Sequence, residues 1–269
     1  MTTRSAAPAV RRRRVEPSIG VGLAMVVAYM VVFNGLQVVA GVDYADYVDS
    51  PGNAWRAVVL PLAAGAVLLI AFVLWSGWDT VWRDPARLPM TWALRTAPLL
   101  FAAVLVLRFA GVDWGDVPAD LLWPILLGGI LVGFCEETLF RGIVLRCLRT
   151  GGRPESRAVL WSCLVFGGFH TGNLLFGQSV GAVAFQVVMA TIAGATLYLF
   201  RRWSGLLVAG MVAHGAWDAS LFLAQDHALE NALSDTIGFV GLALVALAGL
   251  VALVEILVRD RDLVVGTAP

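Results

Sequence analysis

Eight stretches of about twenty mostly apolar residues dominate this sequence, and each is long enough to cross a bilayer as a helix. Hydrophobic residues make up 59% of the 269 residues and charged residues only 14%. A soluble domain of this length has too little interior to bury so much apolar surface. The sequence therefore predicts an all-α membrane protein with about eight transmembrane helices. We expect these helices at about 19–40, 54–75, 92–110, 119–148, 156–171, 179–200, 205–223 and 236–258.

The charges between these stretches predict how the chain is oriented. Connections that hold several arginines alternate with connections that hold no arginine and mostly Asp or Glu. Cytoplasmic connections of membrane proteins are enriched in basic residues, so the pattern places both termini in the cytoplasm. We expect a basic cytoplasmic tail at 1–18, a single polytopic domain at 19–258 and a cytoplasmic tail at 259–269.

Three ionisable residues interrupt the fourth apolar stretch, where a charge costs several kcal/mol unless it is paired or does chemistry. Glu137 and Arg141 are four residues apart and share one face of a helix, in the favourable order of acid before base. Glu136 lies about 100° around the helix from Glu137. The spacing predicts that Arg141 holds Glu137, which leaves Glu136 free to act as a base.

The fifth and seventh stretches carry the other polar residues of interest. His170 lies late in the fifth stretch, and His214 and Asp218 lie four residues apart in the seventh. Counted along the helices, Glu136, His170 and His214 fall near one plane, so they can form one site. Peptide hydrolysis needs a base that activates water, a donor for the oxyanion and an acid for the leaving amine. Glu136 is the candidate base; His170 could share the water or act as the acid, and His214 could donate to the oxyanion.

Other uses of these side chains remain open at this stage. A zinc ion could be held by Glu136, His170, His214 and Asp218, although the HExxH pattern is absent. A structural clasp between helices could account for the pair of Glu137 and Arg141. A proton-coupled transporter would also use buried acids and histidines, but it predicts ion sites in both halves of the chain. The first half, 19–110, places no carboxylate within its apolar stretches.

Together the motifs resemble a known family. Glu136-Glu137-x-x-x-Arg141, then Phe166-x-x-x-His170, then His214-x-x-x-Asp218, are similar in type and order to the three signatures of the CPBP family. That family groups the type II CAAX prenyl endopeptidases with bacterial bacteriocin-processing and self-immunity proteins, the Abi group. The resemblance covers about 121–223.

The resemblance implies an eight-helix intramembrane endopeptidase in a bacterial inner or plasma membrane. It implies that Glu136 activates water together with His170, and that His214 and Asp218 complete the site. The family has been described both as zinc metalloproteases and as glutamate-dependent enzymes, and we favour the glutamate type without a cofactor. The expected partners are the lipid bilayer and a membrane-associated or lipid-modified peptide reached from the cytoplasmic side, and no nucleic acid. The alternative is a non-catalytic self-immunity or membrane scaffold protein that retains the fold.

Overall fold

The computed structural model confirms the predicted fold class. It describes residues 13–84, 90–150 and 152–259, so residues 1–12 and 260–269 of the two expected tails lie outside the described residues. Within the described part, eight helical spans are long and apolar enough to cross a membrane. Helices account for nearly all of the regular structure there, with only two isolated β-bridges.

The spans coincide with the predicted ones, and their ends shift by a few residues. The fifth span shows the largest shift, since it continues to Phe176 where the sequence predicts an end at 171. Four spans are single α-helices: Ile19–Ala40 (α1), Trp92–Ala110 (α4), Val180–Ser204 (α8) and Leu207–Asp226 (α9). Three spans contain a π-helical turn: Pro51–Ser76 (α2 Pro51–Asn53, η2 Ala54–Val59, α3 Leu60–Ser76), Ala119–Arg149 (α5 Ala119–Glu136, η4 Glu137–Val144, α6 Leu145–Arg149) and Ser234–Val258 (the end of α10 Ala232–Thr236, η6 Ile237–Gly241, α11 Leu242–Val258). The remaining span, Glu155–Phe176, consists of α7 (Glu155–Phe169) and the 3-10 helix η5 (His170–Phe176).

Local sequence explains where several of these helices begin and end. The side-chain oxygens of Ser18, Thr91 and Ser179 accept hydrogen bonds from backbone N–H groups three residues further on, which caps α1, α4 and α8. Gly205 ends α8 with φ at 76°, a left-handed conformation that favours glycine. Such caps matter in a membrane protein because lipid offers no partner to unpaired backbone groups.

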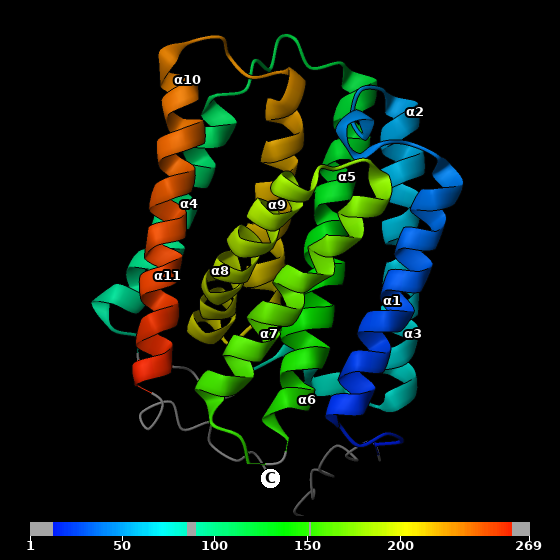
Figure 1. Ribbon diagram of the computed structural model, residues 1–269, viewed down its shortest axis with the longest axis vertical. Helices are drawn as coiled ribbons and strands as arrows, with labels where there is room; N and C mark the ends of the chain where they lie inside the picture. The colour runs from blue at the N-terminus through cyan, green and yellow to red at the C-terminus, as the bar shows by residue number, and fades with distance from the viewer. Residues whose placement is uncertain (1–12, 85–89, 151, 260–269) are drawn as a thin grey trace, which may run out of the picture.

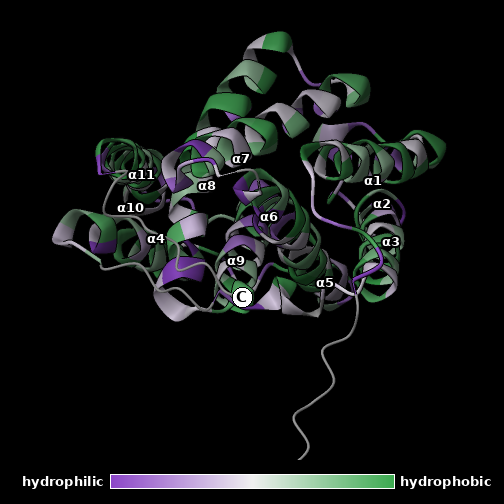
Figure 2. Cartoon of the chain, turned by 90° about the horizontal axis from the view of Figure 1, so that it is seen from below, coloured by the Kyte–Doolittle hydropathy of each residue, from purple (hydrophilic) through white to green (hydrophobic). Residues whose placement is uncertain are grey.

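The outer surface of the bundle is apolar, as expected for a protein solvated by lipid. Val31, Val67, Ile130 and Leu247 are exposed although they lie in the middle parts of their spans. In Figure 2 the hydrophobic colour covers much of the outward faces, while the hydrophilic colour gathers around α6 and the nearby ends of α8 and α9. Several charged side chains are buried inside the bundle, among them Glu137, Arg141 and Arg202.

The helices α5 and α9 lie in the middle of the bundle (Figure 1). On one side of them lie α1 and α3, and on the other side lie α4 and α11. The start of α1 and the end of α11 lie at the same end of the bundle, which we call the terminal end. The candidate site forms around the central pair.

Candidate active site

The stretch with two carboxylates and an arginine lies where α5 passes into the π-helical turn η4. Glu136 is the last residue of α5, and Glu137 begins η4. Every residue of η4 is buried. Single π-helical turns within α-helices are rare and occur frequently at functional sites. Glu137 and Arg141, whose charges are costly to bury, thus lie in an unusual helical turn inside the protein, and Glu136 directly precedes it.

Glu137 connects Arg141 and His214 in this site. Its Oε1 accepts a hydrogen bond from Nη1 of Arg141 at 2.9 Å and another from Nδ1 of His214 at 3.0 Å. The guanidinium of Arg141 also lies over the ring of Phe166, 4.0 Å from its centroid. The predicted pairing of Arg141 with Glu137 is confirmed as a contact. The bond to His214 joins the first motif to the third and was not predicted.

Glycines allow the two helices that carry these groups to approach closely. A Cβ atom on Gly133 of α5 would lie 2.1 Å from the carbonyl oxygen of Met211, and one on Gly129 would lie 2.5 Å from that of Gly215. Since no side chain fits in this space, the backbones of α5 and α9 are in direct contact, as at the small-xxx-small interfaces of membrane helices. This contact brings His214 within hydrogen-bond distance of Glu137.

Two further glycines make room for the ion pair itself. A Cβ atom on Gly210 would lie 3.0 Å from Oε2 of Glu137, and one on Gly194 would lie 3.1 Å from Nη2 of Arg141. The pair is nearly inaccessible, with side-chain exposures of 0% for Glu137 and 1% for Arg141. A buried pair with such close walls holds a fixed geometry, and removal of one member would leave an uncompensated charge.

Three carboxylates surround the imidazole of His214. Because a carboxylate only accepts hydrogen bonds, the bond to Glu137 requires the proton on Nδ1 and leaves Nε2 for other partners. Nε2 lies 3.8 Å from Oε2 of Glu136 and 3.7 Å from Oδ2 of Asp218. These two distances exceed those of direct hydrogen bonds. Glu137 therefore orients the ring, and Asp218, four residues further along α9, makes no direct hydrogen bond to it.

Glu136 differs from its neighbour in that neither Arg141 nor His214 donates a hydrogen bond to it, whereas both donate to Oε1 of Glu137. Oε2 of Glu137 is, like Oε2 of Glu136, buried and makes no hydrogen bond with any described residue. An unpartnered carboxylate oxygen in a low-dielectric interior is costly and is a strong acceptor for a water molecule. The two adjacent carboxylates are thus used differently, as the sequence predicted.

His170 joins the site through Phe166. Nδ1 of His170 lies 3.0 Å from the carbonyl oxygen of Phe166, so Nδ1 donates and Nε2 is the free ring nitrogen. The ring of Phe166 packs edge-on against both imidazoles, with centroid distances of 5.2 Å to His170 and 5.5 Å to His214. One phenyl ring therefore separates and orients the two histidines.

A cavity of about 240 Å³ opens beside these groups. His170, His214 and Asp218 contribute to its wall, together with mostly apolar side chains from α4, α8, α9 and α11. The wall uses the last half of α4, the part of α9 from His214 onward and the first residues of α11, and it reaches Leu197 of α8. The cavity therefore extends from the middle of the bundle toward the end opposite the terminal end.

A tyrosine from the connection between the first two spans reaches the same region. Tyr44 begins the short 3-10 helix η1, Tyr44–Asp46, which lies outside the spans. Burial, and next the negative charge of Asp218, raise the pKa of Tyr44 to about 12. This phenol stays protonated at neutral pH, and the connection that carries it lies near the site.

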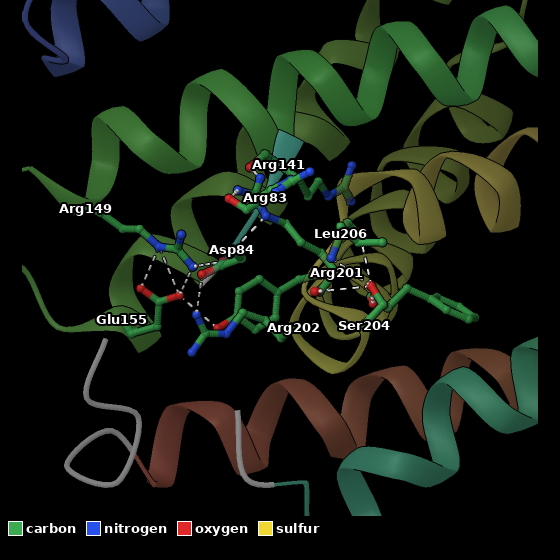
Figure 3. A network of polar contacts seen from close by, with 11 residues as sticks. Arg83, Asp84, Arg141, Arg149, Glu155, Arg201, Arg202, Ser204 and Leu206 are labelled. Atoms are coloured by element: carbon green, nitrogen blue, oxygen red, sulfur yellow. Dashed lines mark hydrogen bonds and ion pairs between the residues drawn. The ribbon is translucent and has the colours of Figure 1, made fainter. Parts of the chain in front are cut away.

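At the terminal end a second polar cluster fixes the helices that carry the site. Asp84 is buried and pairs with Arg149 at 2.9 Å, with Arg202 at 3.0 Å and with Arg201 at 3.5 Å (Figure 3). Arg201 also donates to the backbone carbonyl of Arg141. Burial alone would raise the pKa of Asp84, but the three arginines lower it below its ordinary value. The cluster ties the connection before α4 to α6 and α8, directly beside the first motif.

Sequence reasoning missed two contributors to the site. Arg108 lies near the end of α4, lines the cavity and donates a hydrogen bond to Ser220. Asp84 stands in a connection and carried no signal of burial. By contrast, all six residues predicted for the site lie in one neighbourhood: Glu136, Glu137, Arg141, His170, His214 and Asp218.

The predicted alternative of a zinc site finds no matching geometry. In residues 13–84, 90–150 and 152–259, no group of three or more His, Cys, Asp or Glu side chains is arranged to hold a metal ion. No step proposed below passes through a metal.

The fold and the site define a polytopic integral membrane protein with a polar centre buried between its helices. Residues 118–220 match a family model described as "Rce1-like: Type II CAAX prenyl endopeptidase Rce1-like". The matched segment covers less than half of the chain and contains all three motifs. The match confirms the resemblance over this segment, which is similar to the type II CAAX prenyl endopeptidases. A search of curated proteins found no match.

Proposed function

We propose that this protein is an intramembrane endopeptidase in which Glu136 activates the attacking water. The family match supports an endopeptidase in general terms. The observation that carries the specific proposal is the unequal use of the two carboxylates. Glu137 is bound on Oε1 by both Arg141 and His214, whereas Glu136 accepts neither of these hydrogen bonds and has Oε2 buried without a partner, 3.8 Å from Nε2 of His214.

The proposed reaction adds water across a peptide bond. The carboxylate of Glu136 takes a proton from water while the water oxygen attacks the carbonyl carbon. The tetrahedral intermediate then breaks its C–N bond, and the proton passes to the leaving amine. The products are a carboxylic acid and an amine, so no further reactant is needed.

In this reaction one histidine holds the attacking water and the other stabilises the oxyanion. His170 presents a free Nε2 that can accept a hydrogen bond from the attacking water and help to hold it. His214, when protonated, donates from Nε2 to the developing oxyanion, and Glu137 balances its charge through Nδ1. Arg141 acts as a positioning residue, because its guanidinium is engaged with the carboxylate of Glu137 and the ring of Phe166.

The substrate class follows from the surroundings of the site. The site lies within a bundle whose outer surface is apolar, so a substrate has to be membrane-associated or lipid-modified to reach it. The family's name describes endopeptidases of prenylated CAAX sequences, and a membrane-bound peptide substrate is consistent with that family. We place the protein in a bacterial inner membrane, and we do not extend CAAX cleavage itself to this chain.

A cleavage assay with purified protein and a library of membrane-associated peptides tests the proposal. Glu136→Gln and Glu136→Ala are expected to abolish cleavage, because neither side chain can accept the proton of water. Glu230→Gln makes the same chemical change at an exposed position and is expected to cleave like wild type. Cleavage by Glu136→Ala at the wild-type rate would overturn the proposal. Binding of peptides without any cleavage by wild type would instead favour the non-catalytic immunity or scaffold alternative.

A further inference from the structure

Arg108 of α4 is directed into the cavity. It is partly buried, its Nε donates to Oγ of Ser220 at 2.9 Å, and its guanidinium lies 5.1 Å from the ring centroid of Trp217. Arg108, Trp217, His214 and Asp218 all line the same cavity. The residue lies outside the segment that matches the family model, so no motif assigns it a role.

The charge of Arg108 has no counter-charge in the described part of the chain. No carboxylate there lies within 4.0 Å of its guanidinium, although Asp218 lines the same cavity. A guanidinium offers five N–H donors, and Ser220 accounts for one of them. The neighbouring wall is apolar and includes Phe101, Leu221 and Val245. An unpaired cation against such a wall is costly, and a bound anion would remove that cost.

We propose that Arg108 binds a carboxylate group of the substrate and thereby determines which peptides are cleaved. The proposal rests on the proposed peptidase function and adds a specificity-determining residue to it. A planar guanidinium can bind a carboxylate through two parallel hydrogen bonds, which gives both strength and a fixed orientation. The stacked Trp217 and the bond to Ser220 hold the guanidinium in place for this contact.

The spacing along α9 predicts where that carboxylate lies in the peptide. Ser220 follows His214 by six residues, which corresponds to about 9 Å along the helix at a rise of ~1.5 Å per residue. An extended peptide advances about 3.3 Å per residue. The bound carboxylate is therefore expected two to three residues from the bond that is cleaved near His214. It can be the C-terminal carboxylate of a short tail or the side chain of an Asp or Glu.

Equilibrium binding separates these sources and does not depend on catalysis. The protein carries Glu136→Gln so that no peptide is consumed, and fluorescence anisotropy measures binding of labelled membrane-associated peptides. One pair of peptides differs only in a C-terminal carboxylate against a C-terminal amide, and a second amidated pair differs only in an internal Asp against Asn. We expect one carboxylate peptide to bind about ten- to a hundredfold more tightly than its neutral counterpart, the range of a charge-assisted bond.

The decisive comparison is this preference within each variant, because general damage to binding affects both members of a pair. Arg108→Met is expected to lose the preference, and Arg108→Lys, which retains the charge, is expected to keep a weaker one. The matched control is Arg95→Met, which removes an exposed arginine that lies over Trp92 on the same helix. This variant is expected to keep the full preference.

Several results would overturn the proposal. It fails when neither carboxylate peptide is preferred by the Glu136→Gln protein, or when Arg108→Met keeps the full preference. If Arg108→Met does not fold, Arg108→Lys replaces it in the test, and a full wild-type preference in Arg108→Lys would also overturn the proposal. The proposed function is tested separately. If the wild-type protein cleaves no peptide but the carboxylate preference still depends on Arg108, the carboxylate-binding proposal is supported and the peptidase proposal is refuted.

Discussion

The close contact between α5 and α9 makes a sharp prediction for Gly133→Ala. The new Cβ atom would lie 2.1 Å from the carbonyl oxygen of Met211, whereas ordinary van der Waals contact begins at 3.4 Å. The obstacle is backbone on both sides, so no side chain can rotate away. The helices have to separate by the difference, about 1.3 Å. Overpacking of this kind costs ~1–3 kcal/mol of stability.

The separation acts directly on the site. Met211 and Gly215 flank His214 on α9, so a shift of this part of α9 moves the imidazole away from Glu137. The bond of 3.0 Å would lengthen to roughly 4.3 Å, beyond hydrogen-bond distance. A misplacement of about 1 Å in catalytic groups can reduce a rate about a hundredfold. We therefore expect kcat/KM to fall by about two orders of magnitude.

The assay pairs peptide cleavage with thermal unfolding of the purified protein in detergent. The control is Gly35→Ala in α1, where a Cβ atom meets nothing within 4 Å. That variant is expected to cleave normally and to unfold at the same temperature or slightly higher, because alanine favours the helix. If Gly133→Ala cleaves within a few-fold of wild type and unfolds at an unchanged temperature, the contact between α5 and α9 does not set the geometry of the site.

Three further predictions address the charges. Glu137→Gln leaves Arg141 buried without its counter-charge. It is expected to lower the free energy of unfolding by ~3–5 kcal/mol and to abolish cleavage. An unchanged unfolding temperature would show that the ion pair of Glu137 and Arg141 does not stabilise the fold. The pKa of Asp84 in the folded protein lies below its unfolded value of about 3.9. The stability that the ion pairs of Asp84 give to the folded protein is therefore fully present above about pH 3.9 and is lost as the pH falls through the folded-state pKa. Unfolding temperatures between pH 7 and pH 3 are therefore expected to fall less steeply in Asp84→Asn than in wild type, and parallel curves would contradict this. Finally, chelators are expected to leave cleavage unchanged; a loss that zinc restores would show that a metal takes part.

The sequence predicts well whatever is determined within one helix. Apolar length and loop charge locate the eight spans, because the thickness of a bilayer limits how short a spanning helix can be. The pairing of Glu137 with Arg141 also follows from sequence, since residues four apart share a face even though η4 is π-helical. These are local consequences of backbone geometry.

Contacts between helices are harder to predict because hydropathy does not determine which faces meet. Nothing in the sequence pairs His214 with Glu137, which lie 77 residues apart, or directs Arg108 toward Ser220. One local signal was present: Gly129 and Gly133 form a small-xxx-small pattern, which favours close approach of a neighbouring helix. The burial of Asp84 depends on arginines from two distant helices and carries no comparable signal.

The position of the cavity bears on the sidedness of the reaction. The cavity extends from the middle of the bundle toward the end opposite the terminal end, and the connection that carries Tyr44 lies at that opposite end. If the termini are cytoplasmic, as loop charges predict, the cavity extends from His214 toward the extracytoplasmic side, whereas the resemblance implies access from the cytoplasmic side. The orientation of the chain would then decide whether the peptides it meets are newly exported ones or ones that remain inside the cell.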